Sequence, residues 1–552
     1  MDVVLVGLPG SGKTVIGRRL ANRHAAAFID LDERIESSTG RSIPEIFEGD
    51  GEAAFRAHER NAIAELGAAD PDPEIRRVVA TGGGAVVDPR NRWSLFRGRR
   101  TVWLDGRPEV LAQRLRRSAH VRPLVAGRDP IGAIRDLGAR RSRFYGAADI
   151  HQSGISEVQG VVDSLDERLA RASAGGQAGT TLLRAETPIG RITLGDGIAP
   201  GALAAELETL GAQRAILVSE PGAWDAVGGG IEAGLRQRGW TVERVMLPQG
   251  EAAKRLRVVE DAARELAGLR AERSEPIVAI GGGALGDTAG FLAATYLRGV
   301  PVIQVPSTLV AQVDSSIGGK TGVDLPEGKN LVGAFHQPAA IVIDVELLRT
   351  LPERQLRAAL GEAVKMAALG DERLFELLES EGPLIARGHP SAFGHGAVAE
   401  VVERCAWAKV EVVIADERER RSSGGRITLN LGHSLGHAVE AAAGYGDLLH
   451  GEAVAYGLRA AARIGLEAGV TPPERAARID ALLDRLALAT ELLPYSLQTV
   501  MAHLATDKKH AGRHLRWVLP TADGVVVRDD IAEDVVERAA AGLLATGAGS
   551  PR

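Results

Sequence analysis

The sequence of 552 residues predicts an α/β protein in which two α/β domains precede a mainly helical domain. Two glycine-rich loops support this prediction, Gly7–Thr14 and Gly281–Asp287, because each lies between a predicted strand and a predicted helix. After about residue 347 the strand pattern fades and helical stretches follow one another. The two loops differ in spacing and lie far apart, which indicates two nucleotide-using enzymes on one chain.

Length and composition divide the chain into segments. At about 100–200 residues per domain, the chain is long enough for three or four domains. We predict the first α/β domain over residues 1–172, a flexible linker over 173–185, the second α/β domain over 186–346 and the helical domain over 347–545. The linker prediction depends on Ser173–Thr181, which is small, polar and rich in glycine.

Apolar stretches place the individual elements. In the first domain, strands are predicted at VVLVG, RRVVATGGG and RTVWLD, and helices at KTVIGRRLANRH, PEVLAQRLRRS and DSLDERLARA. The second domain alternates in the manner of a parallel sheet, with strands at RAILVS, TVERVML, PIVAIGGG, VPVIQVP and AAIVIDV. In the third domain we predict helices over RQLRAALGEAVKMAALG, FGHGAVAEVVERCAWAKVEVVIAD and EAVAYGLRAAARIGLEAG, and short strands near RHLRWVLP and GVVVRDD.

Composition argues against several classes of protein. The net charge of −6 is small for this length and gives no general attraction to nucleic acid or to an anionic membrane. Cys405 is the only cysteine, so neither an internal disulfide nor a cysteine zinc site is expected. Met1 leads directly into a predicted strand, and no apolar run reaches about 18 residues. We therefore expect a cytoplasmic protein whose partners are small-molecule substrates.

The first loop has the spacing of a nucleotide phosphate site. Gly7–Thr14 reads GLPGSGKT and fits G-x-x-x-x-G-K-[ST]. Its glycines let backbone N–H groups converge on phosphate oxygens, and the following helix adds its positive end. We expect Lys13 to reach the β- and γ-phosphates and the Thr14 hydroxyl to bind Mg²⁺.

Other residues of the first domain suggest the acceptor of the phosphate. Asp30 and Asp32 follow an apolar stretch, and on a strand they would point the same way, toward Mg²⁺ and an acceptor hydroxyl. The alternative for this pair is a helix N-cap with a first-turn acid. Arg56 has the alternative of a plain surface arginine, and the run Gly82–Gly84 that of a tight turn.

In order, these motifs resemble shikimate kinase over about residues 1–170: GxxGxGKT, D-x-D, GE..FR, GGG, V-R-P-L and R-x-x-x-Y. The resemblance implies a P-loop, nucleoside-monophosphate-kinase-like fold of three layers that uses ATP with Mg²⁺. It implies that Asp30 belongs to the Mg²⁺ shell, that Asp32 orients the substrate hydroxyls, and that Arg122 is a lid arginine. The carboxylate of shikimate is expected at Arg56 and Arg141, with Gly83 close to the ring. The ATP contacts are expected from Gly10, Ser11, Gly12, Lys13, Thr14, Val15, Arg117 and Arg122, and the catalytic groups are Lys13, Asp32 and Arg122.

The first domain departs from the family pattern in two places. The family usually has Pro-Leu-Tyr after the last arginine, whereas this chain has Ser142–Tyr145, SRFY. The predicted lid is also short. Both departures affect the register of Arg117 and the lid.

The second loop is less specific when it is taken alone. Gly281–Asp287 contains G-x-G-x-x-G, but the usual acidic residue about 20 positions further on is missing. Downstream, the stretch VDSSIGGKTGVDLPEGKN is dense in charged and glycine residues. Lysines beside glycine turns suit an anionic ligand, and a solvated loop is the alternative.

The helical domain offers a set of metal ligands. His433 and His437 are four residues apart and share one face if their stretch is helical. His450 follows a glycine turn, and Glu362 lies on an earlier predicted helix. Histidines with one carboxylate form a catalytic zinc site with an open position, although a lone histidine is more often structural.

The second half resembles 3-dehydroquinate synthase over about residues 186–545, with GE..K, GGG..GD..GF, QVDSSIGGKTGV, DERE, R...LN.GH...GHA.E, LHGEAV and DKK in order. The resemblance implies a Rossmann-like α/β domain with a helical metal-binding domain, NAD⁺ and Zn²⁺ or Co²⁺. The implied metal ligands are Glu362, His433 and His450. The implied NAD⁺ contacts are Glu251, Lys254, Gly283, Gly286, Asp287, Ser307, Thr308, Lys320 and Lys329. The implied substrate contacts are Arg298, Asp314, Lys320, Asn330, Lys365, Lys409, Arg426, Asn430, His437 and Lys508.

The chemistry of that family accounts for these residue types. Its substrate is 3-deoxy-D-arabino-heptulosonate 7-phosphate, which is transiently oxidised with NAD⁺, loses phosphate by β-elimination and closes to a carbocycle. A metal polarises the oxygen that is oxidised, and lysines hold the phosphate. Lys320, Lys365, Arg426 and the proton-transferring His437 are the implied catalytic groups. The resemblance also implies a homodimer formed through the synthase half.

Alternatives to this interpretation remain for the second half. It could be a related sugar-phosphate cyclase or a polyol dehydrogenase with a similar loop and metal site, or one half could be an inactive regulatory module. The DSSIGGKTGV run and Lys508 argue against the dehydrogenase, which has no phosphate to hold. Two departures from the family pattern are Glu220 after the strand AILVS and a longer loop over residues 420–425.

Overall fold

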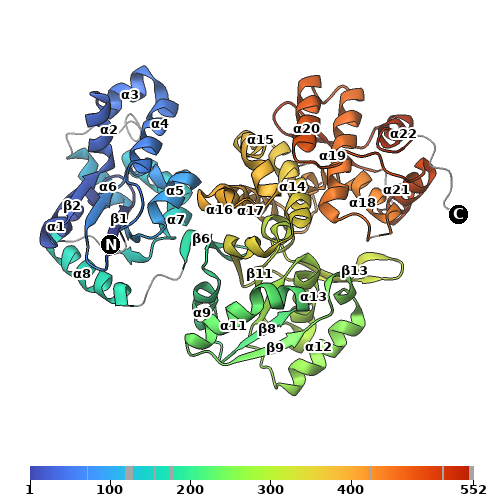
Figure 1. Cartoon of the computed structure of the whole chain (residues 1–552), viewed down its shortest axis with the longest axis horizontal. Helices are drawn as coiled ribbons and strands as arrows, with labels where there is room; N and C mark the ends of the chain where they lie inside the picture. The colour runs from blue at the N-terminus through green and yellow to red at the C-terminus, as the bar shows by residue number, and fades with distance from the viewer. Residues whose placement is uncertain are drawn as a thin grey trace. The chain divides into compact units, whose positions relative to one another are not determined.

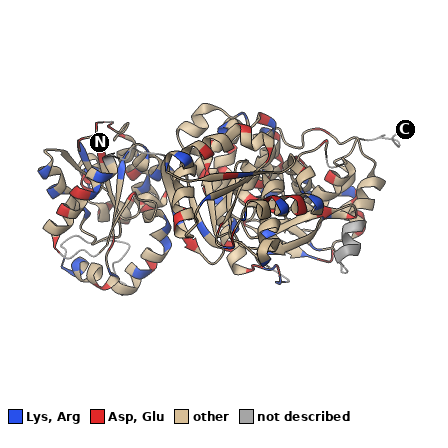
Figure 2. Ribbon diagram, turned by 90° about the horizontal axis from the view of Figure 1, so that it is seen from below, with Lys and Arg blue, Asp and Glu red and all other residues tan. Residues whose placement is uncertain are grey.

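The computed structural model describes residues 1–70, 72–117, 129–153, 157–174, 179–421, 424–444, 446–511 and 515–545. The chain forms two compact units (Figure 1). The first consists of Met1–Thr187 with Arg191–Ile198, and the second of Pro188–Gly190 with Ala199–Arg552. Lysine and arginine are interspersed with aspartate and glutamate in both units, as Figure 2 shows. Among the described helices, none combines the length and apolar character needed to cross a bilayer.

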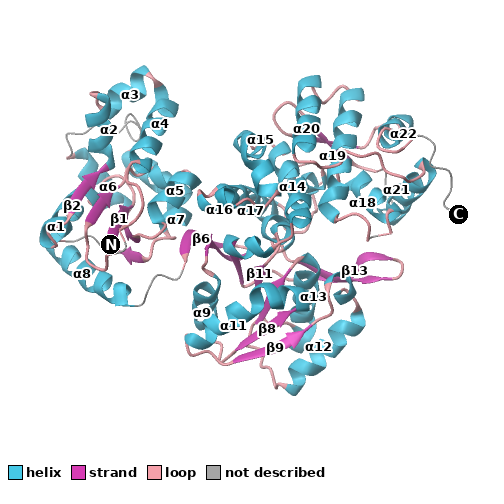
Figure 3. Ribbon diagram, viewed as in Figure 1, coloured by secondary structure: helices cyan, strands magenta, loops and turns pink. Residues whose placement is uncertain are grey.

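A five-stranded parallel sheet forms the middle layer of the first unit (Figure 3). In spatial order its strands are β2 (Ala27–Asp30), β3 (Arg77–Ala80), β1 (Asp2–Val6), β4 (Arg100–Leu104) and β5 (Ile150–Gln152). The described helices of this unit are α1 (Lys13–Arg23), α2 (Leu31–Thr39), α3 (Ile43–Gly49), α4 (Gly51–Ala64), α5 (Pro89–Phe96), α6 (Pro108–Arg116), α7 (Pro130–Tyr145) and α8 (Val158–Ala174).

Helices cover both faces of this sheet, which gives the predicted three layers. Val3 and Leu5 of β1 pack with Leu20 of α1 and Leu165 of α8 in one apolar core. Trp103 of β4 points to the opposite face, because side chains alternate along a strand and its neighbours Val102 and Leu104 belong to that core. There its ring stacks on Tyr145 of α7, with 6.0 Å between the centroids.

The structure corrects the predicted linker over residues 173–185. Helix α8 extends through Ala174, and the strand β6 begins at Thr180 and runs to Thr187, followed by β7 (Gly190–Asp196). β6 packs beside α5 and α7 of the first unit, and Leu182 and Leu183 are buried. The glycine-rich composition of residues 173–181 led to a linker that is predicted too long at its C-terminal end, because Thr180 and Thr181 already belong to β6, which buries its leucines. Residues 175–178 lie outside the described part of the chain.

The second unit begins with another parallel sheet. The strands β14 (Ala340–Asp344), β11 (Val302–Pro306), β10 (Ile277–Gly281), β8 (Ala215–Ser219) and β9 (Val242–Met246) lie side by side in this order. Its main helices are α9 (Ala199–Thr209), α11 (Gly229–Gln237), α12 (Leu256–Gly268) and α13 (Gly283–Thr295). Helices α12 and α13 share one apolar core with β8 and β10. A two-stranded hairpin, β12 (Lys320–Leu325) and β13 (Gly328–Phe335), extends from this layer (Figure 3).

The rest of the second unit is helical, as predicted. It contains α14 (Glu353–Ala368), α15 (Glu372–Ala386), α16 (Pro390–Gly394), α17 (Ala397–Ala415), α18 (His433–Ala442), α19 (His450–Glu467), α20 (Pro473–Arg485), α21 (Leu497–Ala511) and α22 (Glu533–Ala541). The two short strands predicted near the end are confirmed as β15 (Trp517–Pro520) and β16 (Val525–Arg528). Helix α19 packs against α14, α18, α20 and α22, and it is buried along most of its length.

Two glycines let α19 approach its neighbours closely. A Cβ atom on Gly451 would lie 2.0 Å from the carbonyl oxygen of Ala358 in α14. A Cβ atom on Gly457 would lie 1.7 Å from the carbonyl oxygen of Gly432, which precedes α18. Any side chain at these positions would push the three helices apart.

We expect Gly457→Ala to lower the free energy of unfolding of the second unit by about 3 kcal/mol, near the upper end for overpacking, because the added methyl group meets backbone. Chemical denaturation followed by circular dichroism measures the change. Gly230→Ala is the matched control: this helical glycine has open space where the Cβ would be built. Equal stability of the two variants would contradict the close-packing argument.

Candidate active sites

The loop between β1 and α1 has a backbone that requires glycine. Gly7 has a φ of +143°, and a Cβ there would lie 2.4 Å from the Leu104 carbonyl oxygen. Gly12 has a φ of +93° immediately before α1. The Lys13 ammonium is buried within the loop and donates to the carbonyl oxygens of Gly7 at 2.8 Å and Leu8 at 3.1 Å. The loop thus surrounds a cation at the start of a helix, as a phosphate site needs.

Asp30 is joined to this loop, but the predicted strand geometry of the aspartate pair is wrong. Asp30 ends β2 and caps α2, accepting from the backbone N–H groups of Asp32 at 3.0 Å and Glu33 at 3.4 Å. Asp32 therefore lies in the first turn of a helix, because the cap ends the strand after Asp30. The second Asp30 oxygen accepts from the Thr14 hydroxyl at 2.7 Å, so the two expected Mg²⁺ groups are in contact.

The glycine run after β3 lets charged side chains reach the backbone. A Cβ on Gly82 would lie 2.9 Å from Oδ1 of Asp32, and a Cβ on Gly84 would lie 2.7 Å from the Arg56 guanidinium. Arg56 forms an ion pair with Glu59 at 2.8 Å. Glu59 is 1% exposed, and burial raises the pKa of its carboxyl although Arg56 opposes the rise. The sequence analysis did not include Glu59. Its position three residues after Arg56 on one helix could have indicated an ion pair between the two residues.

Helix α7 reaches the same turn from the other side. Arg141 and Tyr145 are one helical turn apart, and they donate to the Gly83 carbonyl oxygen at 2.9 and 2.5 Å. Burial raises the pKa of Tyr145 to about 12, so its hydroxyl stays a donor at neutral pH. These contacts place Arg56 and Arg141 at the same Gly82–Gly84 turn. Val15 is exposed in the first turn of α1, Arg117 is the C-cap residue after α6, and Arg122 lies outside the described residues.

In the second unit, one cavity of about 700 Å³ brings most of the predicted residues together. Its lining includes predicted NAD⁺ contacts, predicted substrate contacts and three histidines: Glu251, Lys254, Gly283, Asp287, Asp314, Lys320, Lys329, Asn330, Lys365, Lys409, Arg426, Asn430, His433, His437 and His450. Five predicted residues with described side chains are not part of this lining: Gly286, Arg298, Ser307, Thr308 and Glu362. Glu362 lies beside the histidines. The side chain of Lys508, on α21, is outside the described residues.

The other four residues outside the lining are placed as follows in the fold. Gly286 packs on Gln304, whose amide donates to the Gly286 carbonyl oxygen at 3.2 Å. The Ser307 N–H donates to the carbonyl oxygen of Gly281, which ties the end of β11 to β10. The Thr308 hydroxyl accepts from the next turn of backbone. Arg298 stands in a left-handed turn with a φ of +65°.

The dinucleotide side of the cavity is held by a partly buried ion pair and by hydrogen bonds. Lys254 contacts the Asp287 carboxylate at 2.8 Å and the Asn330 amide oxygen at 2.5 Å. Burial raises the pKa of Asp287, and Lys254 opposes this shift. The departure at Glu220 has a structural role: its carboxylate accepts from the Gly250 N–H at 2.5 Å and fixes the turn before Glu251.

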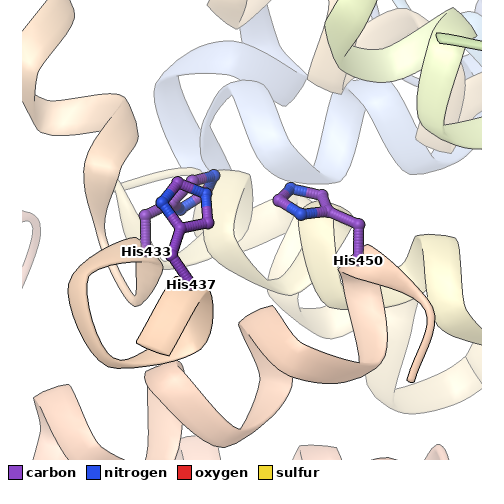
Figure 4. Close-up of side chains that lie close together, drawn as sticks. All are labelled: His433, His437 and His450. Atoms are coloured by element: carbon purple, nitrogen blue, oxygen red, sulfur yellow. The ribbon is translucent and has the colours of Figure 1, made fainter. Parts of the chain in front are cut away.

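Three imidazoles face a common space at the helical side of the cavity (Figure 4). His433 and His437 come from α18 and His450 from the first residue of α19, and each offers a ligand atom within 4.8 Å of the others. The Glu362 carboxylate, on α14, lies 3.5 Å from Nε2 of His433 and 3.3 Å from Nε2 of His450. All four residues could therefore contact one ion.

The donor set fits a metal ion. Glu362 is 0% exposed; its Oε2 pairs with Lys365 at 2.6 Å, and its Oε1 faces the Nε2 atoms of His433 and His450. Burial, reinforced by Lys365, lowers the pKa of His433 to about 3, so its imidazole is neutral and able to coordinate. Its Nδ1 contacts the Leu431 carbonyl oxygen at 3.1 Å, which leaves Nε2 for the cluster. Two imidazoles and a carboxylate suit Zn²⁺ or Co²⁺.

Buried lysines behind the cluster are balanced by Asp314. Lys365 lies 2.6 Å from Glu362 and 3.6 Å from Asp314, and Lys409 lies 2.8 Å from Asp314. Burial opposes the charge of Lys365, yet Asp314 and Glu362 raise the pKa of this lysine. For Lys409, burial lowers the pKa despite Asp314. The cavity floor thus carries two ammonium groups and the acids that stabilise them.

A second acid, Glu419, lies among the remaining cations. Its carboxylate pairs with Lys320 at 2.6 Å and accepts from the Asn430 amide at 3.2 Å. The guanidinium of Arg426 donates to the carbonyl oxygens of Gly318 at 2.9 Å and Glu417 at 2.8 Å. Sequence reasoning noted the DERE motif but gave Glu419 no role, because nothing in its spacing indicates contact with Lys320.

Glu440 is another residue that sequence reasoning missed. It lies on α18, three residues after His437, and its carboxylate contacts His450 and Lys329. The sequence could have placed Glu440 beside the histidines, since positions 433, 437 and 440 share one face of a helix.

Three family models match the chain. Shikimate kinase covers residues 9–169, the N-terminal domain of 3-dehydroquinate synthase covers 244–358, and its C-terminal domain covers 359–510. The 3-dehydroquinate synthase of Symbiobacterium thermophilum is 44% identical over 328 residues, 59% of this chain and 89% of the relative. That of Neisseria gonorrhoeae is 40% identical over 348 residues, 63% of this chain and 94% of the relative.

Solved structures agree with the family models. The 2-epi-5-epi-valiolone synthase of Streptomyces hygroscopicus, with NAD⁺ and Zn²⁺ bound, is 29% identical and has a TM-score of 0.55; the match covers 60% of this chain and 90% of that one. A 2-deoxy-scyllo-inosose synthase with NAD⁺ and Co²⁺ matches at 24% identity and a TM-score of 0.58, over 64% and 97% of the two chains. The second match shows a shared fold.

We expect Tyr145→Phe to lower the free energy of unfolding of the first unit by about 1 kcal/mol, because a buried hydrogen bond to Gly83 is lost. Denaturant unfolding measures this change in the free energy of unfolding. The matched control is Tyr495→Phe, since the structure gives the Tyr495 hydroxyl no hydrogen bond to the described residues. A Tyr145→Phe protein as stable as the parent would show that the contact with Gly83 does not fasten this turn.

Proposed function

Because the chain belongs to the 3-dehydroquinate synthase family and carries a shikimate kinase domain ahead of it, we propose that its two sites catalyse two steps of the shikimate pathway. The first unit phosphorylates shikimate with ATP and Mg²⁺. The second converts 3-deoxy-D-arabino-heptulosonate 7-phosphate to 3-dehydroquinate and phosphate with NAD⁺ and Zn²⁺ or Co²⁺. The single observation that supports the second activity best is the cavity that joins a dinucleotide loop, lysines and a metal-ligand cluster.

In the kinase site, the chain's own groups position two substrates. Lys13 and the loop hold the ATP phosphates, and the Thr14–Asp30 pair holds Mg²⁺. Arg56 and Arg141 bind the shikimate carboxylate in bidentate fashion beside the Gly82–Gly84 turn. Asp32 orients the hydroxyl that accepts the phosphate, so catalysis is positioning with charge neutralisation.

In the synthase site, the two sides of the cavity have separate tasks. Glu362, His433 and His450 would hold a metal ion, which would supply Lewis-acid chemistry at a substrate oxygen, and the dinucleotide side would hold NAD⁺, which would supply reversible hydride transfer. Lys320, Lys409 and Arg426 bind the anionic groups of the substrate. His437 faces the same space and moves protons, and Asp314 keeps the lysines charged and in place.

A related sugar-phosphate cyclase is the second candidate for this half, since the valiolone synthase shares 29% identity. The 44% identity to a 3-dehydroquinate synthase favours the first assignment. Phosphate release from the heptulosonate phosphate, with 3-dehydroquinate as the organic product, distinguishes the two.

We also propose that the protein acts in the cytoplasm as a homodimer formed through the synthase half. Arg298, a predicted substrate contact, is not part of the cavity lining in its own chain. It stands in an exposed turn with Leu297, whose φ of +48° is also left-handed. A partner subunit that brings its Arg298 to the cavity would complete the site.

The two activities should separate by mutation. Lys13→Ala should abolish shikimate-dependent ADP formation and leave phosphate release from the heptulosonate phosphate unchanged. His433→Ala should do the reverse, because each residue belongs to one site only. Both activities are measured on the same purified full-length protein. Loss of both activities in either variant would contradict two independent sites.

Subunit mixing tests the dimer. Arg298→Ala and His433→Ala should each be inactive as synthases, but a refolded equimolar mixture should regain about a quarter of the wild-type activity, because half the dimers are mixed and each has one complete site. The same mixture of His433→Ala with Lys365→Met is the control and should stay inactive. A mixture with Arg298→Ala that also stays inactive would remove Arg298 from the partner's site.

A further inference from the structure

Glu440 holds two groups that belong to different parts of the synthase unit. It is 6% exposed, and each of its carboxylate oxygens has one partner. Oε2 lies 3.0 Å from Nδ1 of His450, at the start of α19. Oε1 accepts from the Lys329 ammonium at 2.9 Å, and Lys329 belongs to the hairpin strand β13. The contact joins residues 111 positions apart in the sequence.

The contact on His450 sets which nitrogen can bind a metal. An imidazole offers one nitrogen as a ligand when the other carries the proton, and a carboxylate is a common acceptor of that proton. Glu440 lies on the Nδ1 side of His450, whereas Nε2 points to Glu362 at 3.3 Å. Glu440 therefore fixes both the tautomer and the ring orientation, while its own oxygens lie on the side of the ring away from the cluster.

The contact on Lys329 connects this histidine to the dinucleotide side. The next hairpin residue, Asn330, accepts from Lys254, and Lys254 pairs with Asp287, the last residue of the second glycine loop. Asn330 itself has a left-handed φ of +56° at this point of the hairpin. Lys329 and Asn330 thus tie one hairpin to the metal side and to the dinucleotide side at adjacent positions.

We propose that Glu440 is a positioning residue for the metal and that Lys329 acts through it. Lys329 fixes the carboxylate, the carboxylate fixes His450, and the affinity for metal depends on a lysine that does not touch the ion. The proposal rests on the metal set of the proposed function.

The test is a metal titration of the full-length chain. Protein stripped of metal is titrated with Zn²⁺ against a chelator, and with Co²⁺ while its visible absorption is recorded. Glu440→Gln should weaken binding about 10- to 100-fold, the usual loss for such a partner, and should shift the Co²⁺ spectrum. Lys329→Met should weaken Zn²⁺ binding several-fold. In the Glu440→Gln background, Lys329→Met should cause no further loss, because its effect passes through Glu440.

Glu467→Gln is the matched control, since Glu467 lies on α19 with His450 but pairs with Arg538 at 2.7 Å. Its Zn²⁺ affinity should equal that of the wild type. Circular dichroism of the metal-free proteins checks the fold. If Glu440→Gln does not fold, the Zn²⁺ affinity of Lys329→Met tests the proposal by itself. An unchanged Zn²⁺ affinity in that folded variant would overturn the proposal that Lys329 acts on the metal through Glu440.

Three other results would also be decisive. Wild-type affinity in Glu440→Gln would overturn the positioning role. Additive losses in the double variant would separate Lys329 from Glu440. A wild-type chain that binds neither Zn²⁺ nor Co²⁺ would overturn the metal site of the proposed function itself, which is distinguishable from failure of the Glu440 proposal alone.

Discussion

The synthase site depends on helices that approach one another more closely than any side chain would allow. At Gly451 and Gly457, α19 presents bare backbone to α14 and to the start of α18, and a Cβ atom added there would lie only 2.0 and 1.7 Å from the facing carbonyl oxygens. One metal-ligand residue stands on each of these three helices. The distances among the ligands therefore follow from helix packing, and an ion would meet a cluster that the apolar contacts of α19 already hold.

Charge balance is the second constraint, because this packing buries ionic groups. Lys365 is 1% exposed and would be costly to bury alone, since an ammonium loses several kcal/mol of hydration. Asp314 and Glu362 offset this loss at 3.6 and 2.6 Å. The same carboxylate that stabilises the lysine also faces two imidazoles, so the positive charge behind Glu362 and the metal in front of it compete for one group.

How much was predictable depended on whether the signal was local. The loop at Lys13 and the pair His433 and His437 could be predicted, because glycine spacing and a helical repeat are local patterns. Glu440 shares the helix face of that pair, yet its partner Lys329 is 111 residues away and its role needed the fold. Asp32 was placed on a strand because apolar residues precede it, but the strand ends two residues earlier, at Asp30, which caps the following helix.

Three of the lysines that line the synthase cavity, Lys320, Lys365 and Lys409, differ in how readily they can change partners. The side chains of Lys365 and Lys409 are 1% and 7% exposed and stay beside Asp314, where separating the charges would leave them unpaired in a poorly solvated place. The Lys320 side chain is 53% exposed, and its pair with Glu419 is of the kind that contributes about 0–1 kcal/mol. Little free energy is needed to move Lys320 from Glu419 to a phosphate and back. A site that releases phosphate in every turnover needs such a cation, because one that bound the leaving anion as tightly as a buried pair would retain its product.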